Sequence, residues 1–181
     1  MQLLSLVIGA VIGLAAPGGE PSRVKLVHPT HRALVKADRR VRTMDSRVSA
    51  ALFSGVTRSR TFASLIDTLD RSDVIVYIEL QHELPRAIDG RLLLASRAGG
   101  LRYVRIQLHS RLGQDHMIAV LGHELQHAIK IAEAPEIRDE ASLRRYYQRA
   151  GAGMSDGVGY DTQAARIAGD TVKRELRSGP A

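Results

Sequence analysis

The sequence predicts an α+β fold, in which a small, mostly antiparallel sheet packs on a central helix with further helices before and after it. Three observations support this prediction. Residues 73–80 form a β-branched, apolar run that is typical of a buried strand. Two apolar segments flank Gly99 and Gly100, as they do in a hairpin. Residues 115–134 are apolar almost all round, as in a helix through the middle of a domain.

The first segment of the chain differs from the rest, because residues 3–16 (LLSLVIGAVIGLAA) are apolar and uncharged. This run is shorter than the about 20 residues that span a membrane. It has the character of the apolar region of a signal peptide, followed by small residues suited to cleavage, although no Lys or Arg precedes it. We therefore expect residues 1–19 to be a signal peptide or N-terminal anchor of an exported protein, periplasmic or secreted. We expect residues 20–181 to form a single domain.

Two helices are predicted ahead of the first strand. In residues 30–51, apolar side chains recur at alternating steps of three and four, which predicts an amphipathic helix: Leu34, Ala37, Val41, Met44, Val48 and Ala51. A second, shorter helix has the same pattern in Phe62, Leu65, Ile66 and Leu69.

After the strand at 73–80, residues 91–97 and 101–108 are expected to be the two arms of the hairpin. The central helix at 115–134 ends at Pro135, which cannot continue it. Residues 139–149 are predicted to be helical, 151–159 to be a loop, and 161–176 to be the final helix.

Composition limits the chemistry. The chain of 181 residues has no cysteine, so a metal must be held by His, Asp or Glu. The formal net charge of +7 predicts weak attraction to anionic envelope surfaces. Aromatic residues make up only 4%, which is a poor basis for stacking nucleic-acid bases, and we expect no nucleic-acid partner.

The most informative motif is His123-Glu124-Leu125-Gln126-His127, within the central helix. Residues four apart lie on one face of a helix, so the two imidazoles can reach one point, with Glu124 beside them. A similar stretch, Gln81-His82-Glu83-Leu84-Pro85-Arg86, lacks this geometry. Arg86 stands four residues after His82, where the motif has its second histidine, and Pro85 prevents a helix.

With this motif, the chain resembles the zincin (HExxH) metallopeptidases, gluzincin-like, and small exported bacterial HExxH proteins. The resemblance covers residues 73–177, and only the five-residue motif is specific. It implies a Zn²⁺ cofactor held by His123 and His127, with Glu124 as the catalytic general base. It also implies an edge strand that binds extended substrate, for which residues 101–108 are the candidate.

The third metal ligand stays open. A metzincin would have Gly and His where this chain has Lys130 and Glu133, and the gluzincin spacing of about twenty residues falls on Tyr147. We favour Asp161 in GYDTQAARIAG, because it opens the last helix, a Gly-rich loop can bring it back, and an acidic residue at this position is implied by the resemblance. Asp161 would otherwise serve as a helix N-cap. The alternative acidic ligands are Glu133, Glu136, Asp139 and Glu140.

The remaining candidates are less specific. Tyr146, Tyr147 and Tyr160 are candidates for a hydrogen-bond donor to an oxyanion, but we expect each of them to be a packing residue. His109 and His116 are expected to be structural or at the surface.

The expected function is zinc-dependent hydrolysis of peptide bonds in a peptide or protein substrate. One alternative is a catalytically inactive, zincin-like module that binds metal or interacts with the envelope. A basic nucleic-acid-binding protein with an accidental motif is the other.

Overall fold

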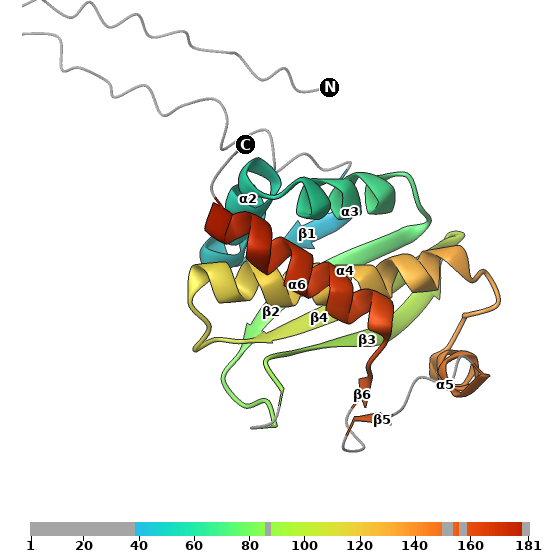
Figure 1. The fold of residues 1–181 in the computed structure, drawn as a ribbon. Helices are drawn as coiled ribbons and strands as arrows, with labels where there is room; N and C mark the ends of the chain where they lie inside the picture. The colour runs from blue at the N-terminus through green and yellow to red at the C-terminus, as the bar shows by residue number, and fades with distance from the viewer. Residues whose placement is uncertain (1–38, 86–87, 150–153, 156–158, 179–181) are drawn as a thin grey trace, which may run out of the picture.

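Residues 39–85, 88–149, 154–155 and 159–178 are described by the computed structural model, and they form an α+β fold (Figure 1). The described part contains five helices, a four-stranded mixed sheet and a short two-stranded ribbon. The predicted leader, residues 1–19, and the start of the predicted first helix lie outside the described residues. Within the described ranges, no helix has the length and apolar character needed to cross a membrane.

The predicted helix over residues 30–51 is wrong over residues 39–45, which hold strand β1 (Val41–Thr43). Its last residues are helical as predicted, because helix α2 (Ser46–Arg58) starts there. The Thr43 hydroxyl donates to the carbonyl oxygen of Ile78, which ties β1 to the sheet. Asp45 then caps a new helix, because its carboxylate accepts from the backbone N–H groups of Arg47 and Val48. Met44, expected on the buried face, is fully exposed.

Helix α3 (Arg60–Asp70) confirms the second predicted helix. Its first turn is capped by Ser59, whose hydroxyl accepts from the backbone N–H of Phe62. The four apolar residues of the predicted pattern are all buried: Phe62, Leu65, Ile66 and Leu69.

The main sheet has the strand order β1-β2-β4-β3, with β2 at Val74–Gln81, β3 at Gly90–Ala98 and β4 at Leu101–His109. The hairpin of β3 and β4 is confirmed, and Gly99 and Gly100 take φ values of 57° and 79° in its turn. The sheet is not mostly antiparallel as expected, because β2 pairs in parallel with both β1 and β4.

The same pairing corrects the expected substrate strand. Residues 101–108 belong to β4, which is hydrogen-bonded on both sides, to β2 and to β3. Val104, Ile106 and Leu108 are fully buried, as befits an interior strand. The edge of the sheet on this side is the other arm of the hairpin, β3.

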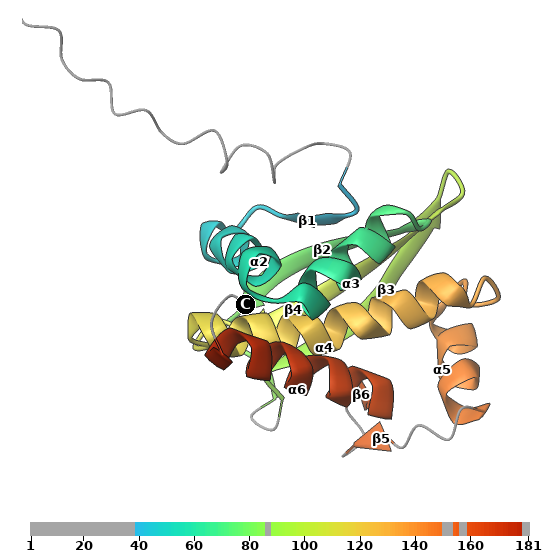
Figure 2. The ribbon, with the colours of Figure 1, turned by 45° about the horizontal axis from the view of Figure 1, so that its top comes forward.

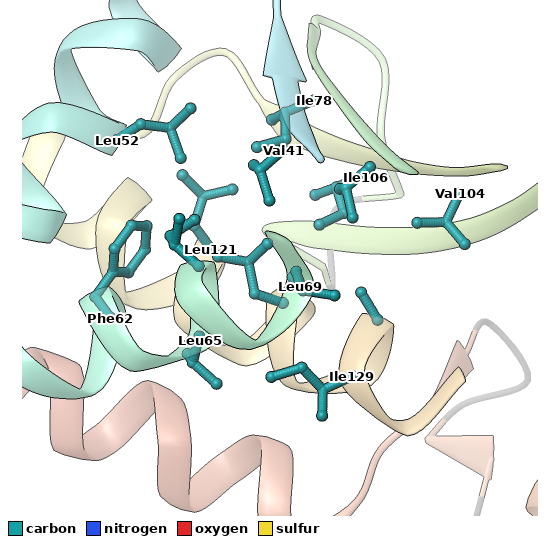
Figure 3. Close-up of a cluster of buried hydrophobic side chains, with 14 of the residues drawn as sticks. Val41, Leu52, Phe62, Leu65, Leu69, Ile78, Val104, Ile106, Leu121 and Ile129 are labelled. Atoms are coloured by element: carbon teal, nitrogen blue, oxygen red, sulfur yellow. The ribbon is translucent and has the colours of Figure 1, made fainter. Parts of the chain in front are cut away.

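The helices gather on one face of the sheet (Figure 2). Helix α4 (Gln114–Glu133) packs on β2, β3 and β4 and confirms the predicted central helix to within one residue at each end. Helix α6 (Gln163–Ser178) crosses α4 on its far side from the sheet (Figure 1). The core fills the space between sheet and helices with aliphatic side chains and Phe62 (Figure 3).

Two further elements connect α4 to α6. Helix α5 (Glu140–Arg149) is close to the predicted 139–149. The predicted loop at 151–159 contains the start of a small antiparallel ribbon, β5 (Met154–Ser155) and β6 (Gly159–Tyr160).

A buried arginine fastens the end of α4 to the sheet. Arg102 of β4 is 3% exposed, and its guanidinium donates to the carbonyl oxygens of Ala132 and Ala134 at 3.1 and 2.8 Å. It also forms an ion pair with Asp73 at 2.6 Å. The last carbonyls of a helix lack partners within it, so Arg102 satisfies them while its charge is balanced.

Candidate metal centre

Helix α4 carries two imidazoles on one face, as the spacing predicts. The Nε2 atoms of His123 and His127 lie 3.2 Å apart, and the ring centroids are 4.9 Å apart. His127 is buried and His123 half-buried. Both ring nitrogens therefore face one point at the edge of the helix.

Asp161 joins these two histidines from the segment just before α6. Its Oδ1 lies 3.7 Å from Nε2 of His123, and the three candidate ligand atoms all lie within 4.8 Å of one another. Asp161 does not cap the helix, because Thr162 does so by accepting from the backbone N–H of Ala165. Arg166, one turn into α6, donates to the other carboxylate oxygen of Asp161 at 3.0 Å.

Close packing of α6 on α4 brings Asp161 to the histidines. At Gly122 of α4, an added Cβ would lie 2.9 Å from Cγ2 of Val172. At Gly169 of α6, an added Cβ would lie 3.2 Å from the carbonyl oxygen of Ala119 and 3.3 Å from Cβ of His123. Two glycines thus allow the helices to approach more closely than side chains would permit.

Glu124 is buried beside the edge strand. It is 6% exposed, and its Oε1 lies 3.4 Å from where a Cβ on Gly90 would be. That Cβ would also come within 2.7 Å of Cγ1 of Val120, so the glycine lets β3 pass close to α4. Burial, and secondly the charge of Asp161, raises the pKa of Glu124 from 4.5 to about 8.

The two histidines are held neutral. Burial, reinforced by His123, lowers the pKa of His127 from 6.5 to about 4. Burial also lowers the pKa of His123, against the opposing effect of the Asp161 carboxylate. Neutral imidazole is the form that binds metals, and both rings are in this uncharged form near pH 7.

Three properties of this cluster fit a zinc ion. Two nitrogens and one carboxylate oxygen are a typical catalytic donor set. At zinc–ligand distances of about 2.0–2.1 Å, tetrahedral ligands lie roughly 3.3 Å from one another. Here His123 lies 3.2 Å from His127 and 3.7 Å from Asp161, and all three ligand atoms lie within 4.8 Å of one another. Finally, Oδ1 of Asp161 is buried and has no hydrogen-bond partner among the described residues, a costly arrangement that a cation at this point would relieve.

Behind His127 lies Tyr147 of α5. Its hydroxyl oxygen is 3.0 Å from Nδ1 of His127, and the two rings meet edge to face with centroids 5.9 Å apart. The sequence predicts Tyr147 as a packing residue or an oxyanion donor, and it does not predict this contact with His127. One signal was available, since Tyr147 stands at the spacing where a gluzincin places its acidic ligand.

The cluster opens into a cleft of about 920 Å³. One wall is the start of β3, from Gly90 to Leu93, and the floor is α4. Helices α5 and α6 supply the other walls, including Leu143, Arg144 and Lys173. A chain of several residues could therefore lie along β3 with one of its bonds near Glu124.

The alternative acidic ligands lie elsewhere. The Glu133 carboxylate pairs with Lys130 at 2.7 Å on the exposed side of α4. Asp139 accepts from Ser142 at the start of α5, and Glu136 is exposed. Glu140 lines the cleft but is not part of the histidine cluster.

The other named residues are also placed. Tyr146 packs edge to face on Tyr147, with ring centroids 5.6 Å apart, and does not line the cleft. His116 is exposed and lies 3.1 Å from Asp89 at the mouth of the cleft, and His109 is half-buried at the end of β4. The side chain of Tyr160 lies outside the described residues.

Comparison of the chain with family models, curated proteins and solved structures gives no match in any of the three.

Proposed function

We propose that this protein is a zinc-dependent peptidase of the zincin type, exported through the leader at residues 1–19. The observation that carries the proposal is the cluster of His123, His127 and Asp161, with the buried Glu124 beside it. Two neutral imidazoles and one carboxylate leave a tetrahedral ion one open position, which distinguishes a catalytic site from a closed structural one.

The reaction divides between the ion and the chain. Bound Zn²⁺ supplies Lewis acidity, which makes a water molecule more acidic and polarises a substrate carbonyl. Glu124 accepts the proton of the attacking water and passes it to the amine that leaves. A positive charge in the cluster favours the carboxylate form of Glu124, which is the form that accepts a proton.

Strand β3 is the part of the chain suited to hold the substrate. Its inner edge pairs with β4, and its outer edge has no strand partner in the described part of the chain. Residues Gly90 to Leu93 of this strand line the cleft. An extended peptide can add to such an edge through backbone hydrogen bonds, which places its scissile bond near Glu124 with little demand on side-chain identity.

The first test is metal content. We expect the purified protein to contain about one zinc per chain by elemental analysis. His123→Ala and Asp161→Asn should lose the zinc. Their zinc affinity should fall by more than about 100-fold, which is the upper end of the effect of changes outside the ligand shell. Glu133→Gln is the matched control, because Glu133 was the rival ligand and is exposed. Zinc binding that survives Asp161→Asn and fails in Glu133→Gln would contradict the site.

The second test is catalysis. Cleavage of a peptide library by the zinc-loaded protein should fall by at least about 100-fold in Glu124→Gln, because the general base is lost, while zinc content stays unchanged. Equal activity of the two proteins would refute the role of Glu124. A wild-type protein that binds zinc and cleaves no peptide in the library would instead support the inactive metal-binding module.

A further inference from the structure

We infer that Tyr147 is a positioning residue of the metal centre, which fixes the ring of His127 so that its Nε2 faces the cluster. This inference deepens the proposed function and rests on the proposed metal site. It concerns a residue that contacts a ligand rather than the ion or the substrate.

The geometry places the hydroxyl on the far side of the imidazole. Nδ1 of His127 is 3.0 Å from the hydroxyl oxygen of Tyr147, while Nε2 of the same ring is 3.2 Å from Nε2 of His123. The two nitrogens of His127 thus have separate partners in opposite directions. Tyr147 therefore contacts His127 through Nδ1, the nitrogen that does not face the cluster, and Tyr147 is not itself a member of the cluster.

The contact between Tyr147 and His127 is buried. Tyr147 and His127 are 3% and 4% exposed, and their rings pack edge to face at an interplanar angle of 75°. Leu143, one turn earlier on α5, is also buried, so this helix packs against the rest of the molecule through two side chains, Leu143 and Tyr147. The start of α5 is fixed as well, because Asp139 accepts from the backbone N–H of Ser142 at 2.7 Å. A hydroxyl held in this way can select one orientation of the imidazole.

Hydrogen bonding then decides which nitrogen can bind metal. A neutral imidazole carries one proton, on either Nδ1 or Nε2. When Nδ1–H donates to the Tyr147 oxygen, Nε2 keeps its lone pair and points it into the cluster. His123 then carries its proton on Nε2 in the metal-free protein, which accounts for the hydrogen-bond distance between the two rings.

Tyr147 is not placed to act as an oxyanion donor, which was one of the roles considered for it from sequence. An oxyanion donor must direct its O–H toward the reacting carbonyl. The Tyr147 oxygen faces Nδ1, on the side of His127 away from the cluster. Its function is therefore to prepare a ligand before substrate or metal arrives.

The test compares Tyr147→Phe with Tyr146→Phe. Both variants remove one phenolic hydroxyl from neighbouring positions of α5, and only Tyr147 contacts His127. Zinc affinity, measured by competition with a chromophoric chelator, should weaken about 10–100-fold in Tyr147→Phe, as for other outer-shell partners of metal-binding histidines. Tyr146→Phe should stay within about twofold of wild type, because its hydroxyl has no part in the proposed contact.

A second readout, the protonation state of the His127 ring, needs no zinc. Nitrogen NMR shifts of the metal-free wild-type protein should show His127 with its proton on Nδ1, and in Tyr147→Phe this preference should shift toward Nε2. A wild-type His127 protonated on Nε2, or a Tyr147→Phe variant with unchanged zinc affinity, would overturn the inference. If wild type binds no zinc, the proposed function fails, and the tautomer of His127 still decides the role of Tyr147.

Discussion

At the scale of single residues, Glu124 is the most consequential side chain, because it is an acid buried where its charge is unfavourable. Without a metal, burial raises its pKa to about 8, so the folded protein keeps a proton that the unfolded chain has released. The folded state then binds more protons than the unfolded state, and the free energy of unfolding falls as the pH rises.

This leads to a prediction for the metal-free protein. His127 has a folded pKa of about 4 against an ordinary 6.5, so it stabilises the fold increasingly up to pH 6.5 and no further. Above pH 6.5 the effect of Glu124 is therefore unopposed by that histidine. From pH 6.5 to 8, the free energy of unfolding, measured with urea, should fall by about 2 kcal/mol, because one proton contributes about 1.36 kcal/mol per pH unit.

The control is Glu124→Gln, which keeps the shape of the side chain and cannot ionise. Its unfolding free energy should change little over the same pH range. An identical loss in both proteins would mean that Glu124 does not hold its proton in the folded state.

Much of the site at this scale was predictable. The pair of histidines follows from helical spacing alone, and Asp161 followed from its place before the last helix and from the resemblance to HExxH proteins. The roles of Gly90 and Tyr147 were not predicted, because they arise from contacts between elements that are far apart in the chain. Arg166 was missed for the same reason, since its partner Asp161 matters only once the cluster has formed.

At the scale of elements, the proposed metal centre depends on the distance between α4 and α6. Gly122→Ala adds a methyl group that would lie 2.9 Å from Cγ2 of Val172, a fully buried and stiff side chain. Alanine favours a helix by about 1 kcal/mol over glycine, but overpacking in a core costs about 1–3 kcal/mol. We expect net destabilisation and weaker zinc binding, because α6 and with it Asp161 must shift.

A double-mutant cycle separates this effect from others. Val172→Ala removes the atom that the new methyl group meets, so adding it to Gly122→Ala should restore zinc affinity toward that of Val172→Ala alone. Unfolding free energies and zinc affinities of the four proteins are the measurement. Strictly additive effects would show that the two positions do not set the spacing of the helices.

The elements themselves were easier to predict than their pairing. Helices α3, α4 and α5 and strands β2, β3 and β4 follow from local periodicity. The region before α2 was predicted wrongly as helix. Its apolar residues keep a spacing of three and four through Val41 and Met44, although the structure has strand β1 and then a new N-cap at Asp45 there. Strand order depends on contacts between distant segments, so β4 was taken for the edge in place of β3.

At the scale of the whole molecule, metal binding and folding should be linked. The proposed ligands come from α4 and from the segment before α6, and these ligands meet only in the folded chain. A ligand that binds only the folded state stabilises it by about 2.7 kcal/mol at a concentration of 100 times Kd. Thermal unfolding should therefore move to higher temperature with zinc and back again with a chelator.

His123→Ala is the control for this linkage. Its midpoint of unfolding should not respond to zinc in the range that shifts the wild-type protein. A shift of equal size in both proteins would indicate that zinc acts at another place on the molecule.

The contacts of Arg102 with Asp73 and with the last carbonyls of α4 form a tether, and its strength depends on pH. Asp73 is 43% exposed, and Arg102 lowers the pKa of this carboxyl below the ordinary 3.8. The tether is therefore fully ionised at pH values above 3.8 and is lost only when the pH falls through the lower value of the folded protein. Once Asp73 is neutral, a guanidinium remains buried without its counter-charge. Strong acid should therefore weaken the contact between β4 and the last turn of α4, at the opposite end of the contact region from the first turns of that helix.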